Sequence, residues 1–282
     1  MGRVTKVAIV PIVAAGAFTG GVTGIGGVLP AGAQTPSPPF LGDLDGDGLA
    51  DRITLGTTGV DCPITVEAGL PGGGYGAPVA HPWSLVPGEP TEICPDRGAV
   101  VDLGGDGVSE LVVTWFSGPP DGYPHQLVVL RDFVVVAGYD GMTQPSSIAA
   151  RDLDGDGLVD LYETTSQGEG FRSYLNTPSG ELVDGPLRAC YDDALWEFAD
   201  FDEDGRDDLV MVHDGYCGQR TRGVAVVLDD GTQVDLSNED LWGEPSAADI
   251  NGDGHQDVSV TVQATGDTVV WAGHGDGTFS PK

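Results

Sequence analysis

Short segments rich in β-branched and aromatic residues recur along the chain, separated by turns rich in Asp, Gly and Pro. Apolar segments of this length, bounded by turn residues, are typical of β-strands. One set precedes an Asp/Gly turn: Ala99–Val101, Ser147–Ala150, Trp196–Ala199 and Ser246–Ala248. A second set follows the turn: Leu111–Trp115, Leu161–Thr165, Leu209–His213 and Val258–Val262. A third set comes next: Ile64–Glu67, Leu127–Leu130, Phe171–Tyr174, Val224–Leu228 and Thr268–Trp271. The pattern predicts an all-β protein.

The turn between the first two sets is the same nonapeptide, repeated five times. The copies begin at Asp43, Asp102, Asp152, Asp200 and Asp249, so their starts are about 50 residues apart. A weaker fourth segment, least regular in the last copy, leads from each third strand to the next repeat. Four strands in a repeat of about 50 residues is the arithmetic of a β-propeller blade. We therefore expect a β-propeller of five four-stranded blades.

The nonapeptide carries the donor pattern of a calcium loop. Calcium prefers six to eight hard oxygen ligands, and oxygens at positions 1, 3 and 5 of a tight loop converge on one ion. Glycine at position 6 permits the sharp turn, while the carbonyl at position 7 and the carboxylate at position 9 complete the ligand set. The predicted ligands are Asp43, Asp45, Asp47, Leu49 and Asp51; Asp102, Asp106, Val108 and Glu110; Asp152, Asp154, Asp156, Leu158 and Asp160; Asp200, Asp202, Asp204, Arg206 and Asp208; and Asp249, Asn251, Asp253, His255 and Asp257.

We expect four to five calcium ions with a mainly structural role, because two copies depart from the pattern. The second copy has Gly104 at position 3 and Glu110 at position 9, and the fifth has Asn251 at position 3. The alternative is that these segments are Asp/Gly turns with solvated carboxylates. Mutual repulsion of carboxylates this close opposes folding without a cation, which favours the calcium interpretation.

The flanking segments decide which calcium module this is. An EF-hand needs helices on both sides and a bidentate Glu at position 12, which four of the five copies lack. With their strand-like flanks, the loops resemble FG-GAP/VCBS-type repeats, the calcium-loop blades also found in integrin α-subunit heads. Gly74–Pro78 and Gly275–Pro281 are similar to further elements of that family. The resemblance covers residues 38–282 and implies a propeller whose calcium ions are held by positions 1, 3, 5, 7 and 9.

The N-terminal segment has the features of a secretory signal peptide. Arg3 and Lys6 precede the uncharged run Val7–Leu29, and Ala31-Gly-Ala33 fits a small-residue cleavage site. An uncleaved membrane anchor is the alternative, which the many glycines of the run disfavour. We expect a signal peptide over residues 1–33, a linker over 34–37, and a secreted protein.

Four cysteines occur in the chain, and all follow the predicted cleavage site. An even number in an exported protein favours two disulfides, with three connectivities open. The repeat register places Cys62 and Cys94 at the same end of adjacent blades, and Cys190 and Cys217 within one blade, at the ends opposite the calcium loops. We therefore predict the disulfides Cys62–Cys94 and Cys190–Cys217.

Charge restricts the partners. The chain has 44 acidic and 12 basic residues, a formal net charge of −32. Such a polyanion lacks the Lys/Arg clusters that bind nucleic acid or an anionic membrane surface. The remaining expectation is a monomeric binding or adhesion module for an unidentified extracellular glycan or protein.

Enzyme motifs are absent: the chain has neither a Gly-x-Ser-x-Gly elbow nor a His-Glu-x-x-His zinc motif. We therefore expect no enzymatic activity. A polysaccharide-active hydrolase or lyase stays as the alternative, since propellers host such sites and carboxylates are abundant. Tryptophans that stack on sugars would favour the glycan role. Trp83 and Trp242 fall between predicted strands and are the exposed candidates, whereas Trp115 and Trp271 end strands and are expected in the core.

Overall fold

The computed structural model describes residues 38–56, 62–84, 93–115, 126–142, 145–165, 170–191, 194–215 and 222–282. All of them belong to one compact unit, Gln34–Lys282. The predicted signal peptide and linker lie outside the described residues and stay predictions. Among the described residues, no helix has the length and apolar character needed to cross a membrane.

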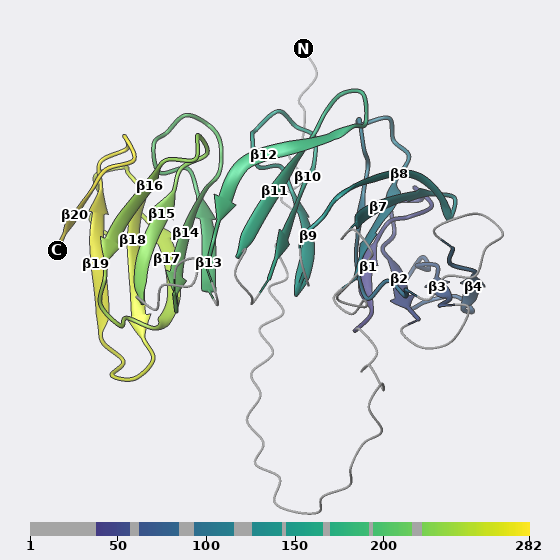
Figure 1. Cartoon of the computed structure of the whole chain (residues 1–282), viewed down its shortest axis with the longest axis horizontal. Helices are drawn as coiled ribbons and strands as arrows, with labels where there is room; N and C mark the ends of the chain where they lie inside the picture. Colours follow the sequence, from purple (N-terminus) through teal and green to yellow (C-terminus); the bar gives the residue numbers. More distant parts are fainter. Residues whose placement is uncertain are drawn as a thin grey trace, which may run out of the picture. The chain divides into compact units, whose positions relative to one another are not determined.

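The unit consists of five four-stranded antiparallel sheets, and each sheet is built from four consecutive strands (Figure 1). The first sheet contains β1 (Phe40–Gly42), β2 (Asp51–Leu55), β3 (Ile64–Glu67) and β4 (Val79–His81). The second contains β5 (Arg97–Val101), β6 (Glu110–Thr114), β7 (Gln126–Arg131) and β8 (Val134–Asp140). The third contains β9 (Ser147–Arg151), β10 (Asp160–Thr164), β11 (Phe171–Asn176) and β12 (Leu182–Ala189). The fourth contains β13 (Ala194–Ala199), β14 (Asp208–His213), β15 (Gly223–Val227) and β16 (Gln233–Ser237). The fifth contains β17 (Gly243–Ala248), β18 (Asp257–Val262), β19 (Thr268–Gly273) and β20 (Phe279–Pro281).

The second and third strands of a sheet are more buried than the first and fourth strands. Every residue of β6 and β14 is buried, whereas the outer strand β8 alternates between exposed and half-buried positions. A strand with a neighbouring sheet against each face buries both sets of side chains, and an outer strand buries one. This difference explains why the continuous apolar runs in the sequence mark second and third strands.

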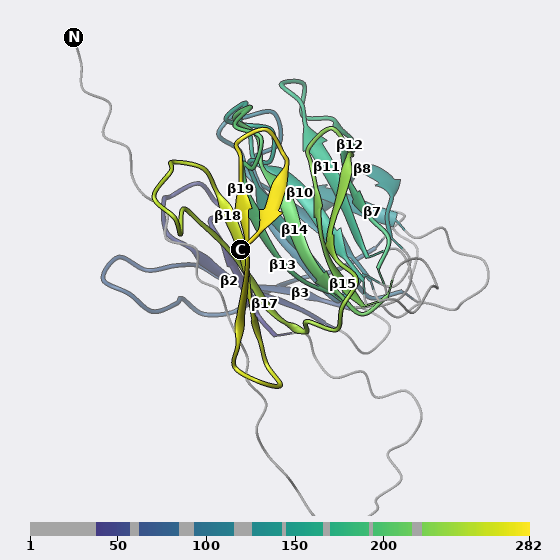
Figure 2. The same ribbon diagram turned by 90° about the vertical axis from the view of Figure 1, so that its left-hand side faces the viewer.

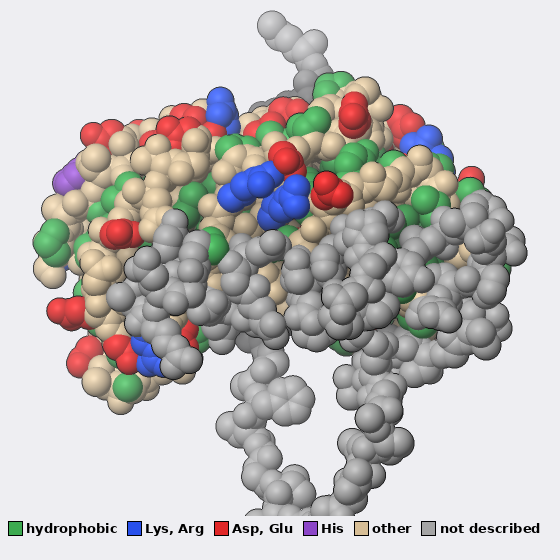
Figure 3. Space-filling model, viewed as in Figure 1, with side chains coloured by type: hydrophobic (Ala, Val, Ile, Leu, Met, Phe, Trp, Pro, Cys, Tyr) green, Lys and Arg blue, Asp and Glu red, His purple; other side chains and the backbone are tan. Residues whose placement is uncertain are grey.

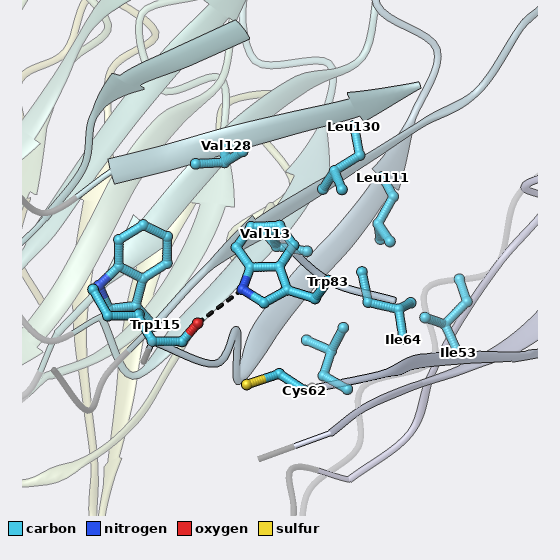
Figure 4. Packing of buried hydrophobic residues seen from close by; sticks show 11 residues of the cluster. Ile53, Cys62, Ile64, Trp83, Leu111, Val113, Trp115, Val128 and Leu130 are labelled. Atoms are coloured by element: carbon cyan, nitrogen blue, oxygen red, sulfur yellow. Dashed lines mark hydrogen bonds between the residues drawn. The ribbon is translucent and has the colours of Figure 1, made fainter. Parts of the chain in front are cut away.

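Hydrophobic clusters fill the spaces between consecutive sheets. The cluster between the first two sheets contains Ile53, Ile64 and Trp83 on one side and Leu111 and Leu130 on the other (Figure 4). Three further clusters join the second sheet to the third, the third to the fourth and the fourth to the fifth. The core is therefore divided among the interfaces between sheets.

The all-β fold of five four-stranded propeller blades is confirmed. The sheets follow one another in chain order, and the view turned by 90° shows β17 to β19 in front of the others (Figures 1 and 2). Each expected strand lies within three residues of an observed one, and the expected Ile64–Glu67 coincides with β3. Within the part of the chain that the structure describes, every sheet consists of four consecutive strands, and the first and last sheets share none.

Candidate metal centres

The five nonapeptide loops connect the first strand of each sheet to the second. In every copy the residue before position 1 pairs with the residue at position 9, as Arg151 pairs with Asp160 in the third sheet. The glycines at position 6 have φ between 83° and 96°, the left-handed region that a side chain disfavours. These glycines are Gly48, Gly107, Gly157, Gly205 and Gly254. The local sequence therefore sets the turn.

Side-chain carboxylates hold the loop backbone in place, as the third copy shows. The carboxylate of Asp152 accepts hydrogen bonds from the N–H groups of Gly155 at 2.9 Å and Gly157 at 3.1 Å. Asp156 Oδ1 accepts one from the N–H of Leu158 at 2.8 Å. The other copies repeat this arrangement, with the first carboxylate accepting from position 4 or 5 and from position 6. Each carboxylate oxygen has two lone pairs, so an oxygen that accepts one hydrogen bond keeps a lone pair for a cation.

Position 9 has a second role that the sequence analysis missed. The carboxylate of Asp160 is fully buried and accepts hydrogen bonds from the N–H of Leu153 at 2.8 Å and of Asn176 at 2.7 Å. Asn176 ends the third strand, so this carboxylate joins the loop to the strand beyond it. Asp51, Asp208 and Asp257 make the equivalent pair of bonds.

Three of the five loops bring carboxylates close enough together to share one metal ion. In each group, one oxygen of every member lies within 4.8 Å of the others. The groups are Asp43, Asp45 and Asp51; Asp152, Asp154 and Asp156; and Asp200, Asp202 and Asp208. Within the described residues, which include all of the second and fifth loops, neither of these loops forms such a group. In the first, third and fourth copies, three of the four predicted carboxylates therefore converge, and the ones outside the groups are Asp47, Asp160 and Asp204.

The fourth loop has an additional group that includes a residue absent from the prediction. Asp202 and Asp204 lie near Asp229, whose side chain is buried. Asp229 follows β15. In the sequence, only its position after the third strand of the repeat indicated that it could lie near the loop. The guanidinium of Arg206 forms an ion pair with Asp229 and lies 3.7 Å from Asp204. This second group already has a basic partner.

Burial and mutual repulsion raise the free energy of the ionised carboxylates in the third and fourth loops. Burial, with a contribution from nearby carboxylates, raises the pKa of Asp160 to about 6 and that of Asp208 to about 7. The same causes raise the pKa of Asp154 and Asp202. Carboxylates are spread over the visible face of the molecule, and basic side chains are few (Figure 3). A bound cation would favour the ionised form of these groups.

The donor set fits calcium in these three loops. Every donor is a hard oxygen, and three carboxylates converge in each loop. None of the three groups' carboxylates takes part in an ion pair with a Lys, Arg or His among the described residues. Carboxylate and carbonyl oxygens are the ligands that calcium prefers.

The Cys62–Cys94 disulfide is confirmed, with a Cα–Cα distance of 5.3 Å across 32 residues of sequence. It links the β2–β3 connection of the first sheet to the segment that precedes the second sheet. Cys217 lies outside the described residues, so the Cys190–Cys217 pairing stays a prediction.

The expectation that Trp83 is exposed is wrong. Its side chain is 3% exposed within the cluster between the first two sheets, and its Nε1–H donates to the carbonyl of Ile93 at 2.8 Å (Figure 4). Trp242 is half-buried against the cluster between the fourth and fifth sheets. Trp115 and Trp271 are buried, as expected. The loop position of Trp83 was misleading because the loop folds back between two sheets.

A cleft of about 440 Å³ lies between the first and second sheets. Apolar side chains such as Val66, Val79 and Leu130 line it together with Asp45 of the first nonapeptide loop. Another wall carries Phe133, whose ring stacks on His81 with centroids 3.5 Å apart. Phe133 has a φ of 63° at the β7–β8 turn, a strained conformation for an aromatic residue. A tertiary contact thus holds this wall in place.

Comparisons with known proteins identify no family for the chain. No family model matches it, and no curated protein matches it. Solved structures of BBS1N in complex with ARL6DN are similar to it. The lead-soaked crystal has a TM-score of 0.43 and 13% identity, over 89% of this chain and 69% of that chain. The mercury-soaked crystal has a TM-score of 0.35 and 15% identity, over 86% of this chain and 79% of that chain.

Proposed function

We propose that this protein is a secreted, calcium-stabilised β-propeller that serves as a binding module for an extracellular glycan or protein. The observation that carries the calcium part is the convergence of three carboxylates in each of three equivalent loops. The carboxylates at positions 1, 3, 5 and 9 and the carbonyl at position 7 would hold the ion. Bound calcium supplies the positive charge that offsets their repulsion.

The calcium part is tested by thermal unfolding in a chelator and in millimolar calcium. With the affinity of extracellular modules, each site adds roughly 0.4 to 1.4 kcal/mol at about 1 mM free calcium. We expect a higher Tm in calcium, and a smaller effect of magnesium, which demands a stricter octahedral geometry. An identical Tm in chelator and in calcium contradicts the proposal.

The binding part is supported by the cleft between the first two sheets. Its volume lies within the range of about 300 to 1,000 Å³ typical of ligand sites, and it combines apolar walls with carboxylates and an imidazole. This cleft replaces Trp83 as the candidate recognition surface. Val79 lines it and is 55% exposed, so its side chain is accessible to a partner.

A glycan array and a binding screen of extracellular proteins, both in calcium, test the binding part. We expect the substitution Val79→Glu to abolish binding, because it places a charge in the apolar cleft. The control Val183→Glu changes a valine that is also exposed, on β12 and away from the cleft. Equal binding by both variants refutes the cleft as the site. Release of sugars from a polysaccharide in the same screen favours the enzyme alternative.

A further inference from the structure

The second loop carries its own cation. Arg131, the last residue of β7, donates from Nε to Glu110 Oε1 at 2.5 Å, and its Nη2 also forms an ion pair with this carboxylate. The same Nη2 lies 3.5 Å from Asp106 Oδ2. Glu110 is at position 9 and is 1% exposed, while Asp106 is at position 5. One guanidinium therefore bridges two positions that a metal ion would bridge.

The third sheet occupies the space of the missing ligand at position 3. The N–H of Gly104 donates to Asn176 Oδ1 at 2.9 Å, and Asn176 Nδ2 donates to the carbonyl of Asp102 at 3.1 Å. A Cβ at Gly104 would lie 2.9 Å from the backbone nitrogen of Gly180 in the β11–β12 turn. The loop has no room for a carboxylate at this position, and Asn176 holds its backbone instead.

The fifth loop has a related arrangement with different residues. Lys282 Nζ lies 3.6 Å from Asp257 Oδ2, the fully buried carboxylate at position 9. Asn251 at position 3 donates from Nδ2 to Asp257 Oδ1 at 3.3 Å. An ammonium and an amide N–H therefore face this carboxylate.

The five loops thus divide into two classes. In the first, third and fourth loops, three carboxylates converge, and none of these nine forms an ion pair with a Lys, Arg or His of the described residues. In the fourth loop Arg206 lies 3.7 Å from Asp204, which is outside the group of Asp200, Asp202 and Asp208. In the second loop the position-9 carboxylate is paired with Arg131, and in the fifth loop with Lys282. In neither of these two described loops do three carboxylates lie close together. Bringing a cation next to a guanidinium or ammonium costs electrostatic energy, because like charges repel.

We propose that the protein binds three calcium ions, in the loops that begin at Asp43, Asp152 and Asp200, and that Arg131 and Lys282 take the place of the ion in the other two. This inference rests on the proposed calcium binding and names the loops responsible. It replaces the four to five ions expected from the sequence.

The test is the number of bound calcium ions per chain, measured by isothermal titration calorimetry and by elemental analysis after dialysis. The variants change the same position in three loops: Asp156→Asn in the third, Asp106→Asn in the second and Asp253→Asn in the fifth. Asparagine keeps the side-chain oxygen that accepts the loop N–H, and circular dichroism checks the fold. We expect three ions in the unchanged protein, two in the Asp156→Asn variant and three in each of the others.

The results separate the two proposals. A count of zero in the unchanged protein refutes calcium binding itself, whereas any other count different from three overturns the division into two classes. Loss of an ion in the Asp106→Asn or Asp253→Asn variant also overturns it. Because the count in the unchanged protein is decisive alone, poor folding of a variant does not leave the inference untested.

Discussion

Acidification is expected to stabilise this protein when calcium is absent. The carboxyl groups of Asp160 and Asp208 have pKa values of about 6 and about 7 in the folded chain, against an ordinary value of 3.8. Both values are raised mainly by burial. In the unfolded chain both groups are ionised above about pH 5, while the folded chain still binds protons there. Stability in metal-free buffer therefore falls as the pH rises through the folded pKa values.

The magnitude follows from these pKa differences. One pKa unit corresponds to about 1.36 kcal/mol, and the folded pKa values lie about 2 and 3 units above the ordinary value. Between about pH 7.5 and about pH 5.5, both groups take up protons in the folded chain but not in the unfolded chain. Over this interval the free energy of unfolding is therefore expected to rise by about 3 kcal/mol for the two groups together. In millimolar calcium, protons compete with the ion for the same oxygens, so the stabilisation by calcium decreases over the same interval.

Urea denaturation at three pH values across this interval tests both expectations. In metal-free buffer it measures how stability changes with pH, and in calcium it measures how the stabilisation by calcium changes with pH. The variant Asp208→Asn removes the group with the higher pKa and is expected to flatten the metal-free profile. Asp230→Asn, at a carboxyl whose pKa is lowered by hydrogen bonds from Thr232, is the control and keeps the profile. A metal-free stability that is constant, or lower at acidic pH, refutes the reasoning.

Three further predictions concern the packing of the sheets. Replacing Cys62 and Cys94 by alanine opens a link across 32 residues and is expected to cost about 4 kcal/mol in the chain-entropy model; a loss below about 1 kcal/mol in chemical denaturation contradicts it. Trp83→Ala is expected to cost about 3 to 5 kcal/mol, because a buried indole and its hydrogen bond are lost; unchanged stability would restore the exposed interpretation. Gly104→Ala and Gly48→Ala both place a side chain at a φ of 83°, but only Gly104 faces a backbone within 3 Å. We expect Gly104→Ala to lower the Tm further, and equal losses would contradict the close approach.

Much of the fold was predictable because its determinants are local. Each second strand begins at position 9 of a loop, one residue before the start expected from the apolar pattern, as at Asp160 and Asp208. The acidic residue at position 9 adds one more residue pair to the β-sheet next to the loop. An apolar pattern cannot reveal this pair, because the residue is charged. The Cys62–Cys94 pairing was also predictable, because the repeat places both cysteines at the same end of adjacent blades.

The candidate sites were predicted only in part, because their electrostatics depend on residues far away in the sequence. Arg131 lies 21 residues after Glu110, and Asn176 lies 72 residues after Gly104. Neither belongs to the nonapeptide, so the motif alone favoured four to five ions. Trp83 is a similar case, since its burial depends on the approach of the second sheet.

The amino-acid sequence by itself determined the strands, the repeat and the turn of each loop, because glycines and carboxylates within nine residues set that geometry. Only the tertiary structure decided which of these loops bring three carboxylates together and which pair the position-9 carboxylate with a basic side chain. Pairing of neighbouring strands brings Arg131 to Glu110, and packing of one sheet against the next crowds Gly104. Asp152, Asp154 and Asp156 lie together and form no ion pair with a Lys, Arg or His of the described residues. Charge compensation acts through space between neighbouring strands and sheets, so identical motifs acquire different electrostatic surroundings.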